Sequence, residues 1–260
     1  MNYTIKYVVL CEKGNKRKTN QDNFWCGGNF LSVENNGLST CLTDSTNNAT
    51  IPIFAIFDGM GGARYGETAA YIATKTLNSL CSTTDKSNSI QFLATSCKKM
   101  NDEICAYAKN NQAAGMGTTA VLLAFGTKNI YVCNIGDSKA FLYNIKTFMQ
   151  ISYDHVVSIP NAKKLPLSQH LGIPQDEFVI NPYLATGEYN DGDRYLLCSD
   201  GLTDMVSMEE MESILSQKKP VADVAQVLME AALNNGGSDN ITIILCELHK
   251  NKFFKRKVLK

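Results

Sequence analysis

The sequence lacks the features that mark several broad classes of protein. No run of apolar residues approaches the ~18 that a membrane-spanning helix needs, and the apolar stretch near the N-terminus is too short for a signal peptide. The 25 basic and 25 acidic residues cancel, so no overall field attracts nucleic acid or an anionic membrane. We therefore expect a soluble, cytoplasmic protein whose chemistry depends on a local site.

Cysteine occurs nine times, but without the spacing of a metal site or a disulfide framework. The sequence has no CxxC pair, and the number of cysteines is odd. Reduced thiols that pack as small apolar groups fit this pattern better than disulfides or a structural zinc ion. We expect neither.

The 260 residues, 44% of them hydrophobic, are enough for one large domain. Short segments rich in β-branched and aromatic residues predict strands at 4–10, 52–57, 118–125, 129–136, 139–145, 193–199 and 240–248. Apolar residues spaced by three and four predict helices within 70–80, 90–108 and 221–232. Strands joined by only a few residues form antiparallel hairpins, which favours an α+β fold.

Two segments show no clear period. Residues 153–184 contain four of the six prolines and predict a long connection or small lobe, and such connections are often functional. Residues 26–50 are rich in Asn, Ser and Thr and predict a surface excursion.

Aspartates recur where the predicted strands begin or end. Asp58, Asp137 and Asp200 each follow an apolar segment. Asp239 precedes the last strand, and Asp22 lies near the start of the chain. Asp-Gly and Ser-Asp also form ordinary turns, and for any single residue this alternative stays open. Turn chemistry alone, however, does not require three apolar strands to end in aspartate.

If these strand ends converge, the carboxylates repel one another unless cations lie between them. Carboxylates without a His or Cys partner are hard oxygen ligands that suit Mg²⁺ or Mn²⁺. Beyond Asp58, the backbone at Gly59, Gly61 and Gly62 can take positive φ and approach an ion closely. A helix predicted to begin near Arg64 would direct its N-terminal amides to the same place. No Lys-Ser or Lys-Thr follows the glycines, so a nucleotide-binding loop is excluded.

Arg17 lies shortly before Asp22, and a guanidinium can hold a phosphoryl group through two hydrogen bonds. It belongs to a short basic run, residues 16–18, of a kind that is also common on solvated loops. Both interpretations stay open from this segment alone.

Six ordered motifs resemble those of the metal-dependent Ser/Thr protein phosphatases, the protein phosphatase 2C-like or PPM family, and of its bacterial type in particular. They are RKTNQDN, FAIFDGMGG, GMGTTAVL, NIGDSKAFLY, LLCSDGLTDMV and GGSDNITIIL, and they extend from about Gly14 to Leu248. The resemblance implies a four-layer α-β-β-α sandwich of two antiparallel sheets flanked by helices, with a dinuclear metal centre at one end. It also implies a single catalytic domain over residues 1–248, with a short flap region at about 154–184.

The resemblance also assigns metal ligands, residue by residue. Asp58 would bridge two Mn²⁺ or Mg²⁺ ions, and the carbonyl of Gly59 would bind one of them. Asp200 and Asp239 would bind the other ion. Asp137, together with Asp200, would hold a weaker third ion.

Beside Asp58, the catalytic residues implied by the resemblance are Asp22, which would orient the attacking water, and Arg17, which would hold the substrate phosphate. The implied reaction is hydrolysis of phosphoserine and phosphothreonine in proteins by a metal-activated water, without a phosphoenzyme. The implied partners are phosphoproteins, including a bacterial Ser/Thr kinase that the enzyme opposes. We expect a monomer with no nucleic-acid partner.

The chain departs from the animal pattern of the family at two positions. Animal members have a histidine, proposed to protonate the leaving oxygen, where Met60 stands; bacterial members commonly have methionine. A thioether cannot donate a proton, so the general acid is unassigned, and His155 is the nearest substitute in sequence. Gln21 replaces a glutamate, which removes a charge close to the second ion.

Two further features bear on substrates. The flap region is shorter than in typical bacterial members, which implies weaker discrimination among substrates or docking elsewhere. Residues 249–260 form a basic tail that is either a solvated end or a docking or membrane-surface segment.

Two other functional classes stay open. A non-catalytic binding module of the same fold would be expected to have lost Asp58, Asp200 or Asp239, and all three are present. A divalent-metal phosphoesterase could instead act on small molecules or nucleic acid, although the neutral charge disfavours nucleic acid.

Overall fold

The computed structural model describes residues 2–60, 65–160 and 164–251, and within them the chain forms two antiparallel sheets. The first sheet has the spatial order β3 (Leu42–Asn47), β1 (Tyr3–Glu12), β12 (Ile241–Lys250), β11 (Arg194–Cys198), β8 (Lys139–Asn144) and β9 (Thr147–Gln150). The second has the order β10 (Tyr183–Glu188), β7 (Asn129–Ile135), β6 (Ala120–Phe125), β4 (Ile53–Met60) and β2 (Asp22–Cys26), with the short β5 (Gly117–Thr118) paired to β4.

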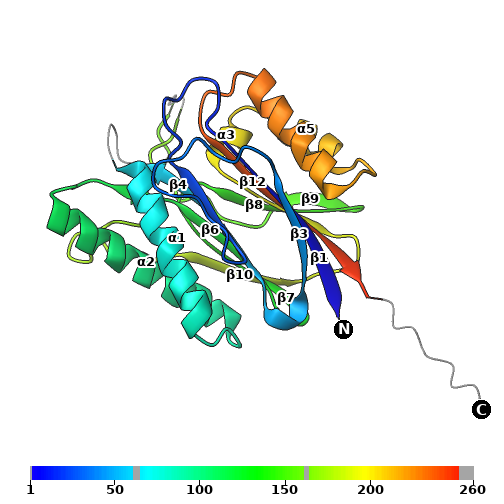
Figure 1. The fold of residues 1–260 in the computed structure, drawn as a ribbon, viewed down its shortest axis with the longest axis horizontal. Helices are drawn as coiled ribbons and strands as arrows, with labels where there is room; N and C mark the ends of the chain where they lie inside the picture. Colours follow the sequence, from blue (N-terminus) through cyan, green and yellow to red (C-terminus); the bar gives the residue numbers. More distant parts are fainter. Residues whose placement is uncertain (1, 61–64, 161–163, 252–260) are drawn as a thin grey trace, which may run out of the picture.

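Helices cover the outer face of each sheet (Figure 1). The long helices α1 (Gly66–Thr83) and α2 (Ser89–Asn111) pack on the second sheet. The first sheet is covered by α3 (Asp200–Thr203), α4 (Met208–Leu215) and α5 (Val221–Asn234), and η1 (Asn48–Thr50) is a single 3₁₀ turn. The predicted α+β, four-layer arrangement is confirmed.

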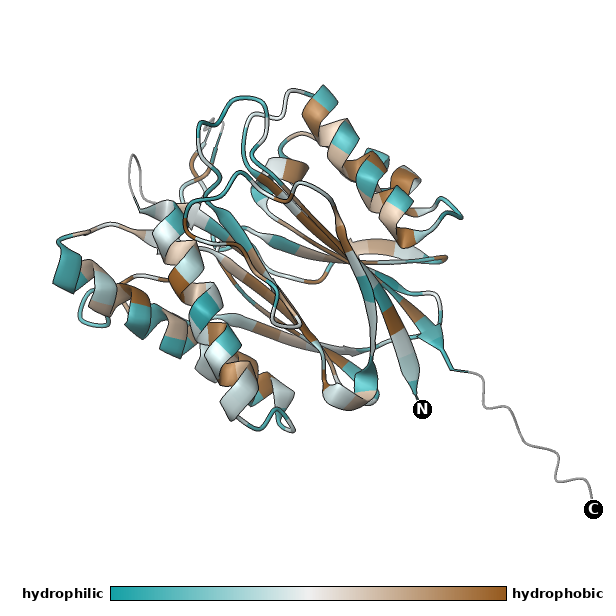
Figure 2. Ribbon diagram, in the orientation of Figure 1, coloured by the Kyte–Doolittle hydropathy of each residue, from teal (hydrophilic) through white to brown (hydrophobic). Residues whose placement is uncertain are grey.

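Strand β6 shows how the two cores are divided. Val121, Leu123 and Phe125 enter the core between the sheets, whereas the alternate residues Ala120, Leu122 and Ala124 face α1 and α2. Successive side chains of a strand point to opposite faces, so a strand between two apolar layers is apolar throughout. Apolar residues accordingly follow the central strands, while polar and apolar residues mix along the helices (Figure 2).

The predicted helices and strands are all present, but the sequence pattern missed shorter elements. Within residues 26–50 the chain adds β3 as an edge strand, and its largely exposed polar residues carry no apolar alternation. Residues 153–160 and 164–182 are irregular apart from isolated bridges, and β10 begins at Tyr183.

The ends of the predicted domain are only partly described. Strand β12 continues to Lys250, two residues beyond the expected domain end, and residues 252–260 of the basic tail lie outside the described residues. The division into a domain and a tail stays a prediction. Among the described helices, none combines the length and the apolar composition needed to cross a bilayer.

We expect the contact between α1 and the second sheet to contribute strongly to stability. Leu77 of α1 is fully buried in this layer, so Leu77→Ala should lower the free energy of unfolding by about 2–5 kcal/mol through lost burial and a residual cavity. Ser79→Ala, at an exposed position of the same helix, should change it by less than about 0.5 kcal/mol. Urea denaturation measures both; equal effects would contradict this packing.

Candidate metal centre

The predicted aspartates converge at one end of the sandwich. Asp22 at the start of β2 lies directly opposite Asp58 of β4 in the second sheet. Asp200 follows β11 and Asp239 precedes β12, which are neighbours in the first sheet. A cleft of about 550 Å³ between these strand ends is lined by Arg17, Gln21, Asp58, Gly59, Met60, Thr119, Asp137, Lys164, Leu165, Pro166, Leu167, Asp200, Asp239 and Asn240.

Asp22 is the most enclosed carboxylate and links the two sheets. Its Oδ2 accepts hydrogen bonds from the hydroxyls of Ser199 and Thr242, each at 2.7 Å, and both donors belong to the first sheet or its edge. Its Oδ1 is buried without a hydrogen-bond partner among the described residues. Burial, with smaller contributions from the charges of neighbouring aspartates, raises the pKa of Asp22 to about 7.

Asp58 lies opposite Asp22 on the neighbouring strand of the second sheet. Burial raises the pKa of Asp58 well above its usual range, and the charges of Asp200 and Asp22 raise it further. Its backbone is held by Thr119, whose hydroxyl accepts from the Asp58 N–H at 3.1 Å and whose N–H donates to the Asp58 carbonyl at 2.9 Å. The carboxylate is therefore rigidly placed in a site that disfavours its charge.

Gly59 is required for close approach, not for positive φ. A Cβ atom at this position would lie 2.3 Å from the carbonyl oxygen of Gly66, at the start of α1, and 2.5 Å from that of Gln21. The expectation that Gly59 needs positive φ is thus not met, because its backbone does not adopt it. Gly61, Gly62 and Arg64 lie outside the described residues, and α1 begins at Gly66.

Two cationic side chains contact the acidic cluster. Arg17 donates from Nη2 to Oδ2 of Asp239 at 2.5 Å. Lys164 Nζ lies 2.5 Å from Oδ2 of Asp200 and 3.7 Å from Oδ2 of Asp239, so the ammonium stands between the two carboxylates. Sequence reasoning missed Lys164, because it belongs to the irregular flap region and no motif separates it from the other basic residues.

These residues fit divalent cations by the chemistry of their donors. Within the described residues, no group of three or more His, Cys, Asp or Glu side chains is already arranged so that it could hold a metal ion. Yet Oδ1 of Asp200, like Oδ1 of Asp22, is buried and makes no hydrogen bond within the described chain. Crowded carboxylates with unpaired oxygens are satisfied by hard cations, and Lys164 shows that a positive charge is accommodated between Asp200 and Asp239.

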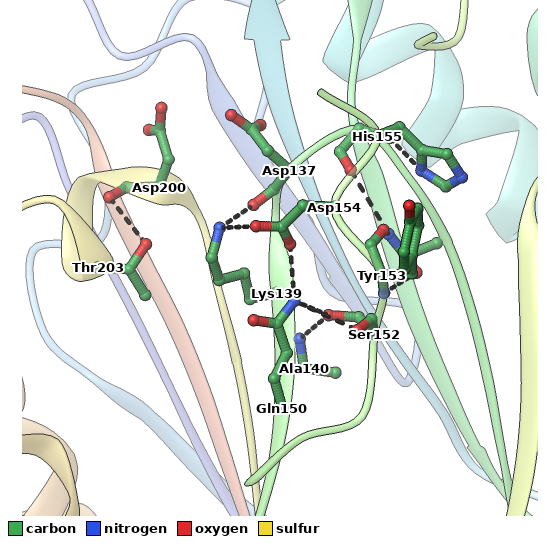
Figure 3. A network of polar contacts seen from close by, with 12 residues as sticks. Asp137, Lys139, Ala140, Gln150, Ser152, Tyr153, Asp154, His155, Asp200 and Thr203 are labelled. Atoms are coloured by element: carbon green, nitrogen blue, oxygen red, sulfur yellow. Dashed lines mark hydrogen bonds and ion pairs between the residues drawn. The ribbon is translucent and has the colours of Figure 1, made fainter. Parts of the chain in front are cut away.

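Asp137 connects the cluster to the start of the flap region (Figure 3). Lys139 donates from Nζ to the Asp137 carbonyl at 3.0 Å and pairs with Oδ2 of Asp154 at 2.8 Å. Gln150 donates to the other oxygen of Asp154 at 2.6 Å. Burial and the charge of Asp200 raise the pKa of Asp137 to about 6, although Lys139 partly offsets them. The charge of Asp200 therefore acts on Asp137, as would be required if these two residues together bound a third metal ion.

His155 is anchored to the backbone beside Asp137. The ring nitrogen Nδ1 accepts a hydrogen bond from the backbone N–H of Gly136 at 3.2 Å, and the backbone N–H of His155 donates to the Gly136 carbonyl at 3.0 Å. Figure 3 shows the ring turned away from Asp137 and Asp200. Burial lowers the pKa of His155, which keeps the imidazole neutral. The ring is thus held at the start of the flap region, directed away from the acidic cluster.

The crowding of carboxylates predicts an unusual pH dependence of stability. Because the pKa of Asp22 is raised to about 7 from 3.8 and that of Asp58 is raised also, the folded state binds more protons than the unfolded state between about pH 4 and 7. Stability then falls as pH rises through this interval. In chelator-treated protein, the midpoint of thermal unfolding should drop by about 4–8 °C between pH 5 and 7.5, corresponding to about 2 kcal/mol.

The controls for this measurement are Asp22→Asn, which should flatten the pH dependence, and added Mg²⁺, which should raise the midpoint at pH 7.5. A chelator-treated wild type that becomes more stable across the same interval would contradict the described electrostatics.

Known proteins share both the sequence pattern and the fold. Residues 8–163 match the family model of Protein phosphatase 2C. The serine/threonine phosphatase Stp of Listeria welshimeri is 31% identical over 91% of this chain and 93% of its own length. The protein phosphatase PhpP of Streptococcus pneumoniae is 29% identical over 95% and 98%. The structure of the catalytic domain of PstP in complex with two manganese ions is 27% identical, covers 95% of this chain and 100% of that one, and superposes with a TM-score of 0.78. The chain therefore belongs to the protein phosphatase 2C family.

Proposed function

We propose that the cleft hydrolyses phosphoserine and phosphothreonine in proteins with two divalent cations held by Asp58, Gly59, Asp200 and Asp239. As a member of its family, the chain is a serine/threonine phosphatase of the protein phosphatase 2C type. The observation that carries the proposal is the convergence of acidic side chains from both sheets in one open cleft, with Arg17 among its lining residues.

The proposed ligands follow from the chemistry of the donors. Asp58 would be shared by the two ions, the Gly59 carbonyl would bind one of them and Asp200 with Asp239 the other, while Asp137 and Asp200 would hold a weaker third ion. When bound, the cations activate a water as nucleophile and neutralise charge that develops on the phosphoryl group. Oxygen ligands suit both Mn²⁺ and Mg²⁺, and the similar PstP domain was solved with two manganese ions.

Asp22 handles the proton of the attacking water. Ser199 and Thr242 fix its Oδ2 and so orient the carboxylate. Its Oδ1 is buried and has no hydrogen-bond partner among the described residues, and Asp22 lies opposite the lining residue Asp58 and is not itself one of the residues that line the cleft. A pKa raised to about 7 matches the task of accepting a proton near neutral pH. Asp22 therefore orients the water and receives its proton at Oδ1.

Arg17 binds the substrate phosphate. Its side chain is about half exposed (48%) and pairs with Asp239 at the edge of the cleft. Pairs of this exposure contribute only about 0–1 kcal/mol, so the guanidinium can exchange the carboxylate for a phosphoryl group at small cost. Its fork then holds two phosphoryl oxygens and keeps phosphorus in line with the water.

The biological setting follows from this chemistry. The enzyme acts as a cytoplasmic monomer on phosphoproteins and opposes a Ser/Thr kinase. An open cleft suits a phosphorylated side chain on a protein surface, and the balanced net charge of the sequence gives nucleic acid no general attraction.

Hydrolysis of a phosphothreonine peptide tests the proposal. Purified protein should release phosphate with Mn²⁺ or Mg²⁺ and stop when excess chelator is added. Asp200→Asn should lower kcat/KM by at least about 100-fold, since ion-based stabilisation of the transition state is worth several kcal/mol. Asp223→Asn, an exposed aspartate on α5, should stay within about twofold.

Two outcomes would contradict the proposal. Nucleotides or DNA hydrolysed as well as the phosphopeptide would favour a phosphoesterase of different specificity. A folded protein that binds Mn²⁺ without hydrolysing any of these substrates would favour a binding module.

A further inference from the structure

The reaction needs a proton donor for the leaving oxygen, and Met60 cannot supply one. Serine and threonine leave as poor alkoxide groups unless they are protonated in the transition state. The chain has three histidines. His155 is anchored to Gly136, and His249 lies near the far end of β12, about 25 Å along the strand from the cleft. His170 remains.

Midway along the flap region, Leu171 forms an isolated antiparallel bridge with β5. Thr118 and Leu171 exchange two backbone hydrogen bonds, from Thr118 N to Leu171 O at 3.0 Å and from Leu171 N to Thr118 O at 2.9 Å. On its other side, β5 pairs with β4, where Met60 lies opposite Gly117. Residues around Leu171, β5 and the end of β4 therefore form one small antiparallel patch.

The register of this patch places His170 on the same face as residues that line the cleft, although His170 is not itself one of the lining residues. Directly opposite residues share a face in antiparallel strands, and residues two apart in one strand do so as well. The Thr118–Leu171 pair sets His170 opposite Thr119, which is two residues from Gly117. Met60 lies opposite Gly117, and Asp58 is two residues before Met60. Thus His170 and Met60 share the face of the metal ligand Asp58.

Gly117 makes room for the imidazole between these residues. A Cβ atom on Gly117 would lie 2.4 Å from Nδ1 and 2.7 Å from Cε1 of His170, so the ring covers this bare backbone position. The ring therefore reaches from the flap region over Gly117 of β5, the residue that Met60 faces on β4. Its side chain is only partly buried.

The hydrogen bonds of the ring set its tautomer. Nδ1 lies 2.8 Å from the Leu171 carbonyl oxygen, which can only accept, so Nδ1 carries a proton and donates. For the remaining nitrogen, Nε2, no hydrogen bond to the described part of the chain is found, and an imidazole nitrogen can hold and transfer a second proton.

We propose that His170 is the general acid of this phosphatase, in the place that Met60 leaves without a donor. The inference rests on the proposed function. As the oxygen of water bonds to phosphorus and the P–O bond to the side chain breaks, Nε2 gives its proton to the leaving Oγ of serine or Oγ1 of threonine. The attacking water gives one proton to Asp22, and solvent exchange restores both groups, so the products are the free hydroxyl and phosphate.

Substrates that differ in leaving group test this role. His170→Gln should lower kcat for a phosphothreonine peptide by about 100-fold or more, with little change in KM. For p-nitrophenyl phosphate, whose stable phenolate leaves without a proton, kcat should change by less than about threefold. His249→Gln serves as the matched control and should affect neither substrate.

A second variant tests placement rather than identity. Adding Met60→His to His170→Gln restores an imidazole across Gly117 and should recover at least about tenfold of the lost peptide activity. Independently of turnover, the His170 ring signals in NMR spectra should shift when inorganic phosphate is added in the presence of Mg²⁺. Circular dichroism of each variant checks folding.

Equal losses on both substrates, no loss on the peptide, or ring signals unaffected by phosphate would each overturn the inference while leaving the proposed function intact. A wild type inactive on both substrates would overturn the proposed function and this inference with it.

Discussion

Repulsion among carboxylates held in a buried cluster is the constraint on which the rest of the structure depends. Asp22 and Asp58 face each other across neighbouring strands, and each is buried enough that its charged form is disfavoured. Such a cluster persists only if the fold holds it and cations compensate it. Arg17 and Lys164 supply part of the compensating positive charge, and divalent ions would supply the rest.

The apolar layers supply the force that holds the cluster together. A core between the sheets and a core under each helical layer keep the strand ends in place, and the hydroxyls of Ser199 and Thr242 join the sheets at Asp22. The flap region is attached at both of its ends. Asp154 pairs with Lys139 beside Asp137, and Leu171 pairs with Thr118, which follows on from Gly117 opposite β4, so the flap region is tied to the strands that carry the acidic cluster.

The sequence predicted the helices and strands whose buried apolar residues recur at a regular spacing. Strand β6 and helix α1 bury regular apolar positions, and strands that end in aspartate indicated the acidic site. Edge strand β3 was missed because it buries too little to impose alternation. Lys164 and His170 were missed because their contacts bring an irregular segment against residues distant in sequence, which no local pattern records. The reason for glycine at position 59 could not be seen in the sequence either, since the close approach comes from Gly66 and Gln21.

The central claim is that these carboxylates hold a pair of divalent ions between the two sheets. Crystals soaked in Mn²⁺ and measured at the manganese absorption edge test it directly. The account predicts two strong anomalous peaks bounded by Asp58, Asp200 and Asp239, with the Lys164 ammonium displaced from Asp200. Peaks absent from this cleft at saturating Mn²⁺, with Lys164 still paired to Asp200, would contradict it.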